Sequence, residues 1–127
     1  MRPDKLDSIV HRYVAAWNET DAVSRAEIIA RCWAIGGIYI DPSVHVVGRD
    51  ALSNHIAQVQ ARRPGARIEF VSDIDAHHSV FRFDWRVVRA DGKSGLTSTD
   101  FGEISDDGFL SKIIGFFGPV PRGNSNR

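Results

Sequence analysis

Apolar residues recur at steps of three and four along the first half of the chain, which is the spacing of one face of an amphipathic helix. One helix is expected to begin at Pro3 and Asp4 and to bury one face. The apolar positions of that face are Leu6, Ile9, Val10, Tyr13, Val14 and Trp17.

Two further helices are expected before the middle of the chain. One has Thr20 or Asp21 as its cap, a buried face that includes Trp33, and the pair Gly36-Gly37 as its stop. The other runs from Arg49 to Arg63, with Leu52, Ile56 and Val59 facing inward, and Pro64-Gly65 ends it.

Alternation of apolar and polar residues predicts strands elsewhere. A short strand at Ile38-Tyr39-Ile40 is ended by Asp41-Pro42, because a residue before proline favours extended geometry. Longer strands are expected at 68–74, 80–88, 95–104 and 109–117, with His77-His78 opening the second of them and turns at 91–92 and 106–108.

This order of elements predicts an α+β domain in which three helices pack on a strongly curved antiparallel sheet. Such a sheet leaves a conical pocket that is open at one end, a natural site for a small molecule. The expected single domain spans residues 1–118, and the polar tail 119–127 is expected to be flexible.

Composition narrows the class of protein. The 127 residues are 43% hydrophobic and 25% charged, with sixteen basic and sixteen acidic side chains, so a globular fold is expected and a nucleic-acid surface is disfavoured. No apolar run is long enough for a membrane span, and the charged N-terminus lacks the apolar core of a signal peptide. The single cysteine, Cys32, excludes an internal disulfide and a cysteine metal site. A soluble cytoplasmic protein is expected.

Three polar residues in apolar surroundings are candidates for chemistry. Asp100 lies in mid-strand, where aspartate is depleted, Asp41 ends the short strand, and Tyr13 lies on the buried face of the first helix. Each has a structural alternative: an outward-facing aspartate, an ordinary Asp-Pro turn, and a core tyrosine. His77 and His78 should point to opposite faces of a strand, so no metal site is expected.

The chain resembles the nuclear transport factor 2-like superfamily, and within it the ketosteroid isomerases and the SnoaL-like polyketide cyclases. The matching segments, in chain order, are Arg12-Tyr13-Val14-Ala15-Ala16-Trp17-Asn18, Tyr39-Ile40-Asp41-Pro42, Gly48-Arg49-Asp50-Ala51-Leu52, Asp100, and Gly115-Phe116-Phe117-Gly118.

The resemblance implies cofactor-free acid–base chemistry on a hydrophobic carbonyl or polyketide-like molecule. In ketosteroid isomerases an Asp-Pro aspartate carries the proton, while a tyrosine and an uncharged aspartic acid hold the enolate oxygen. The matching residues here are Asp41, Tyr13 and Asp100. The expected pocket-lining residues are Trp17, Tyr39, Phe83, Trp85, Ser98 and Phe117.

Two other functions and a dimer are also expected from these patterns. A non-catalytic module that binds small hydrophobic ligands is the main alternative. An epoxide hydrolase ranks lower, because Arg82 and Asp84, which resemble the Arg-x-Asp pair of limonene epoxide hydrolases, should face away from the pocket. Apolar residues on the outer sheet face, including Phe101 and Phe116, predict a homodimer through that face.

Overall fold

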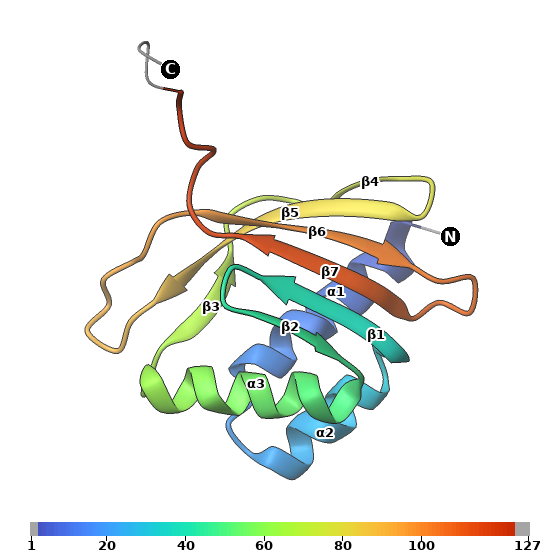
Figure 1. Cartoon of the computed structure of the whole chain (residues 1–127), viewed down its shortest axis with the longest axis horizontal. Helices are drawn as coiled ribbons and strands as arrows, with labels where there is room; N and C mark the ends of the chain where they lie inside the picture. Colours follow the sequence, from blue (N-terminus) through green and yellow to red (C-terminus); the bar gives the residue numbers. More distant parts are fainter. Residues whose placement is uncertain (1–2, 124–127) are drawn as a thin grey trace.

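The computed structural model describes residues 3–123 as three helices and seven strands (Figure 1). In chain order they are α1 (Pro3–Asn18), α2 (Ala22–Ala30), β1 (Trp33–Asp41), β2 (Val44–Val47), α3 (Arg49–Arg62), β3 (Arg67–Phe70), β4 (Asp75–His77), β5 (Val80–Val88), β6 (Ser98–Ile104) and β7 (Leu110–Phe116).

The strands form one open sheet in the order β2-β1-β7-β6-β5-β3, and β4 pairs with β5 alone. Neighbouring strands are antiparallel except β1 and β7, which are parallel, so the sheet is mixed rather than wholly antiparallel. The parallel pair joins the first strand of the chain, β1, to the last, β7. The expected α+β class is confirmed.

All three helices lie on one side of the sheet, which curves over them (Figure 1). Their apolar faces and the inner sheet face share one core, in which side chains from both layers are fully buried, including Val10, Ile29, Leu52, Leu110 and Ile113. The helical periodicity of the sequence therefore identified the buried faces of α1 and α3.

The predicted end of the second helix is wrong. Helix α2 stops at Ala30, and Trp33 begins β1 instead of continuing the helix. The glycine pair lies inside that strand: a Cβ on Gly37 would lie 2.5 Å from Nε1 of the buried Trp33 side chain. Gly37 is therefore needed to make room for an indole ring, and a break in register between Trp33 and Ile38 accommodates it.

The predicted strand 68–74 is shorter than expected, and a separate strand, β4, follows at Asp75. Strand β3 ends at Phe70, where the Ser72 hydroxyl accepts a hydrogen bond from the Asp84 backbone N–H and replaces a ladder partner. His77 ends β4 rather than opening β5, and His78 takes a left-handed conformation, with φ of 54°. Their two Nδ1 atoms lie 3.0 Å apart, so the expected opposite orientation is also wrong.

Strand β2 was not expected, because its four residues are too few to show a clear alternation of apolar and polar side chains. The tail that was expected to be flexible, 119–127, includes residues 124–127, which lie outside the described residues. Between residues 3 and 123 no helix is long and apolar enough to cross a membrane.

Candidate active site

Two carboxyl groups lie on either side of Gly115 in the middle of the sheet. Asp100 of β6 pairs with Gly115 of β7, and Asp41 follows the β1 residue that pairs with the preceding residue of β7. A Cβ on Gly115 would lie 2.9 Å from Asp100 Oδ1 and 3.6 Å from Asp41 Cβ. Because glycine has no side chain, position 115 leaves space above β7 for both aspartate side chains.

Asp41 is held by donors on both of its oxygens. Oδ2 accepts a hydrogen bond of 2.6 Å from the Tyr39 hydroxyl. Oδ1 accepts from the Ser43 hydroxyl at 2.6 Å and from the backbone N–H groups of Ser43 and Val44 at 2.7 and 3.2 Å. Burial alone would raise the pKa of Asp41, but the hydrogen bonds from Ser43 and Tyr39 outweigh it and lower the pKa below 3.8. Asp41 is therefore ionised at neutral pH.

His55 on α3 is a buried neighbour of this carboxylate that the sequence analysis missed. Its Nε2 lies 3.6 Å from Asp41 Oδ2 and has no hydrogen-bond partner among the described residues. Burial lowers the pKa of His55, although Asp41 opposes that effect, so the imidazole is uncharged at neutral pH. The helical spacing from Leu52 places position 55 on the inward face, and that spacing could have identified it.

Asp100 has the opposite electrostatic environment. It is 5% exposed, and over residues 3–123 it accepts a single side-chain hydrogen bond, from Trp85 Nε1 to Oδ1 at 2.9 Å. Burial raises the pKa of Asp100 to about 7, the Trp85 bond lowers it in part, and the charge of Asp41 raises it again. At neutral pH Asp41 is therefore ionised, whereas Asp100 keeps its proton in about half of the molecules.

Tyr13 completes the buried polar group. Its hydroxyl is enclosed, 1% of the residue is exposed, and the oxygen has no hydrogen-bond partner within residues 3–123. Burial raises the pKa of Tyr13, the charge of Asp100 raises it further, and the neighbouring Trp17 side chain lowers it in part, although the two side chains do not meet the geometry of a hydrogen bond. A buried hydroxyl without a partner is unusual, since it forgoes about 1–3 kcal/mol.

A cavity of about 890 Å³ opens beside these groups. Its lining comes from helices and strands and includes both apolar and charged side chains. The residues that line it include Trp17, Tyr39, Asp41, Ser43, Val59, Arg62, Arg63, Ile68, Trp85, Val87, Arg89, Asp91, Leu96, Ser98 and Phe117.

The structure sorts the nine predicted site residues into two groups. Six line the cavity, namely Trp17, Tyr39, Asp41, Trp85, Ser98 and Phe117. Tyr13, Asp100 and Phe83 do not. Phe83 faces inward as expected, but it is 2% exposed and packs against Phe70 and Phe81 within the core, so it lies behind the cavity wall in this structure. Trp85 contacts both the cavity and Asp100, which lies deeper.

Arg82 and Asp84 take no part in this group. Arg82 pairs with Asp75 at 2.8 Å on the exposed surface, while Asp84 accepts a hydrogen bond of 2.6 Å from Thr99. Neither lines the cavity. In the part of the chain that the structure describes, no three His, Cys, Asp or Glu side chains are grouped as they would be to bind a metal ion.

Comparison with known proteins supports the fold without assigning an activity. No family model and no curated protein matches the chain. Among solved structures, a protein from Agrobacterium tumefaciens, described as a candidate isomerase of the SnoaL-like family, is 28% identical, with a TM-score of 0.84 over 89% of this chain and 97% of its own.

Two more distant structures share only the fold. A nuclear transport factor 2-like superfamily protein from Salmonella enterica is 15% identical, with a TM-score of 0.71 over 98% of this chain and 95% of its own. A protein with a ketosteroid isomerase-like fold from Catenulispora acidiphila, crystallised with trimethylamine, is 13% identical, with a TM-score of 0.69 over 87% and 85%. The resemblance seen in the sequence is thus confirmed: the chain has the fold of the nuclear transport factor 2-like superfamily.

Proposed function

We propose that the protein catalyses cofactor-free proton transfer on a hydrophobic carbonyl or polyketide-like molecule bound in the cavity. One observation carries the proposal: two carboxyl groups flank Gly115, and their surroundings move their pKa values apart, below 3.8 for Asp41 and to about 7 for Asp100. Such a separation provides a base and an acid at the same pH.

Asp41 is the proposed base because it is ionised and lines the cavity. It takes a proton from the carbon beside the carbonyl group, the electron pair of that C–H bond forms a C=C bond to the carbonyl carbon, and the π pair of the carbonyl bond moves to its oxygen. The proton then returns to the same or another carbon as the carbonyl re-forms. Tyr39 and Ser43 keep the carboxylate in one position through their hydrogen bonds.

Tyr13 and protonated Asp100 are the proposed donors to the enolate oxygen. The unpartnered Tyr13 hydroxyl supports this role, since a donor without a partner is available to a ligand. Because Trp85 borders the cavity and covers Asp100, the proposal includes a movement of the Trp85 indole when substrate enters.

Deuterium exchange tests the proton transfer directly. With indanone and related hydrophobic ketones in deuterium oxide, the wild type should incorporate deuterium beside the carbonyl, and Asp41→Asn should lower that rate by roughly a hundredfold or more. Asp73→Asn, which changes an exposed aspartate outside the cavity, should leave it unchanged. Equal rates in wild type and Asp41→Asn would remove Asp41 as the base.

A non-catalytic ligand-binding module is the second candidate. The observation that favours it is the position of Tyr13 and Asp100 outside the cavity wall, together with donors on both oxygens of Asp41. Fluorescence of Trp17 and Trp85, which line the cavity, should report ligand binding. Binding of hydrophobic ketones with no exchange above the solvent rate would favour this function over catalysis.

A further inference from the structure

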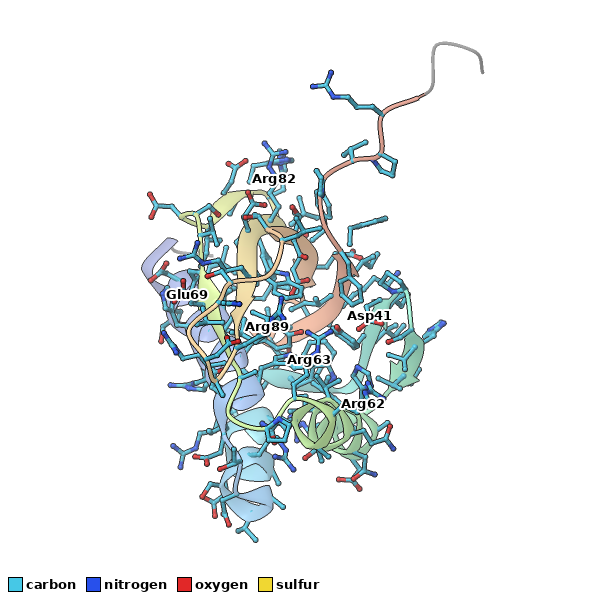
Figure 2. All side chains as sticks on the ribbon, turned by 90° about the vertical axis from the view of Figure 1, so that its left-hand side faces the viewer. Asp41, Arg62, Arg63, Glu69, Arg82 and Arg89 are labelled. Carbon is cyan, nitrogen blue, oxygen red and sulfur yellow. The ribbon has the colours of Figure 1, made fainter. Side chains whose placement is uncertain are left out.

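Three arginines are grouped at the end of the cavity. Arg62 ends α3, Arg63 follows it, and Arg89 follows β5, so two segments far apart in the sequence contribute them. Figure 2 shows all three on the same side of the molecule as Asp41. Each is exposed at the surface.

The loops that carry these arginines are in contact. Gly65, with φ of +78°, lies against Ala90, and a Cβ at position 65 would be 2.9 Å from Ala90 Cβ. Gly65 is two residues from Arg63, and Ala90 is next to Arg89. The close contact fixes the separation of the two segments, so the guanidinium groups border one opening rather than two separate surfaces.

Carboxylates do not neutralise these three arginines, in contrast to three arginines on β3 and β5. Arg82 pairs with Asp75, and Glu69 pairs with Arg86 and Arg67. Over residues 3–123, Arg62, Arg63 and Arg89 have neither an ion pair nor a side-chain hydrogen bond.

The acidic residues of the cavity lining, Asp41 and Asp91, are fewer than its three arginines, so positive charge is in excess. Asp91 Oδ1 accepts a hydrogen bond from the Lys93 backbone N–H within its own turn. Asp41 accepts hydrogen bonds from Tyr39 and Ser43. The cavity therefore combines an arginine-rich opening, apolar walls and an anionic inner group.

We propose that the ligand is an amphipathic anion, an apolar body that bears one carboxylate or phosphate group, and that Arg62, Arg63 and Arg89 bind the anionic group. Arginine suits this role because its planar fork donates two parallel hydrogen bonds to carboxylate or phosphate oxygens. The negative charge of Asp41 repels a second anion, so the acid group lies at the opening and the apolar end points inward. This inference rests on the proposed function and specifies its substrate class.

Calorimetric titration with matched probes tests the inference. Phenylbutyrate and phenylbutyramide share an apolar body and differ in charge, and phenylbutyl phosphate separates carboxylate from phosphate recognition. Wild type should bind phenylbutyrate or the phosphate at least about tenfold more tightly than the amide. The double variant Arg63→Gln/Arg89→Gln should lose that preference while binding the amide as before.

Arg31→Gln, a change of another exposed arginine that does not line the cavity, is the matched control and should keep the preference. The preference should also fall as salt is raised from low to physiological concentration, because exposed charges are screened. Equal binding of acid and amide by wild type, or no binding of any probe, would overturn the inference. The deuterium exchange of ketones that depends on Asp41 is measured separately and does not depend on these binding results. The proposed proton transfer and the proposed anionic ligand can therefore fail independently.

Discussion

Replacing Asp100 by asparagine should stabilise the protein at alkaline pH, and the size of this effect follows from its burial. In the folded protein the pKa of Asp100 is raised from 3.8 to about 7, mainly by burial. The folded state therefore holds a proton that the unfolded state has released, and stability falls as pH rises between those two values. At about 1.4 kcal/mol per pH unit, the full cost is about 4 kcal/mol by about pH 8 and less than about 1 kcal/mol near pH 4.

Asparagine removes this cost without creating a cavity. It has the shape of aspartate, its oxygen can accept the Trp85 N–H that Asp100 accepts at 2.9 Å, and it cannot ionise. The free energy of unfolding of Asp100→Asn, minus that of wild type, should therefore rise by several kcal/mol between about pH 4 and pH 8. Other titrating groups cancel in this difference.

The subtraction is needed because His55 and Asp41 act in the opposite sense. The pKa of each is lowered in the folded protein, so each contributes stability that is lost as pH falls, below about 6.5 for His55 and below about 3.8 for Asp41. Urea unfolding at several pH values measures the difference, with Asp73→Asn as the exposed control. A difference that does not change with pH, or that decreases toward pH 8, would refute the assignment of a buried, largely protonated Asp100.

Three further outcomes can be tested separately. Gly115→Ala should destabilise by about 1–3 kcal/mol in urea unfolding, because its Cβ would lie 2.9 Å from Asp100 Oδ1, whereas Gly36→Ala meets nothing within 4 Å; equal stabilities would contradict this. Tyr13→Phe should lower ketone exchange roughly a hundredfold through a lost donor and should not lower stability, since the hydroxyl has no partner; a large loss of stability would assign Tyr13 a structural role. Light scattering at micromolar concentration should give a dimer mass that Phe101→Asp converts to a monomer, because Phe101 and Phe116 are 42% and 56% exposed on the outer sheet face; a monomeric wild type would contradict the dimer.

The sequence predicted the fold because periodicity identifies which face of an element is buried. The buried faces of α1 and α3, and the inward positions of Ser98 and Asp100, follow from steps of 3.6 and two residues. A different rule, that a glycine pair often ends a helix, failed at Gly36-Gly37. Here Gly37 accommodates the ring of Trp33, and only a tertiary contact reveals that purpose.

The site was harder to predict because periodicity gives a face but no depth. Phe83 and Asp100 lie on the inward face as expected, yet neither lines the cavity: Phe83 packs against Phe70, and Asp100 is hydrogen-bonded to Trp85. Helical spacing gives the inward face of His55, but its position beside Asp41 and the grouping of the arginines depend on contacts between α3 and segments distant in sequence. Such contacts need the positions of both segments, which local patterns do not provide.

A carboxyl titration by NMR tests the central claim most directly, because the proposed chemistry needs one aspartate that is ionised and one that is still substantially protonated near neutral pH. With carbon-13 in the aspartate carboxyl groups, one resonance should titrate near pH 7 and disappear in Asp100→Asn. A second should titrate below 3.8 and disappear in Asp41→Asn. An Asp100 resonance that titrates at or below 3.8 would contradict the account, because both carboxyl groups would then be ionised and no acid would remain to hold the enolate.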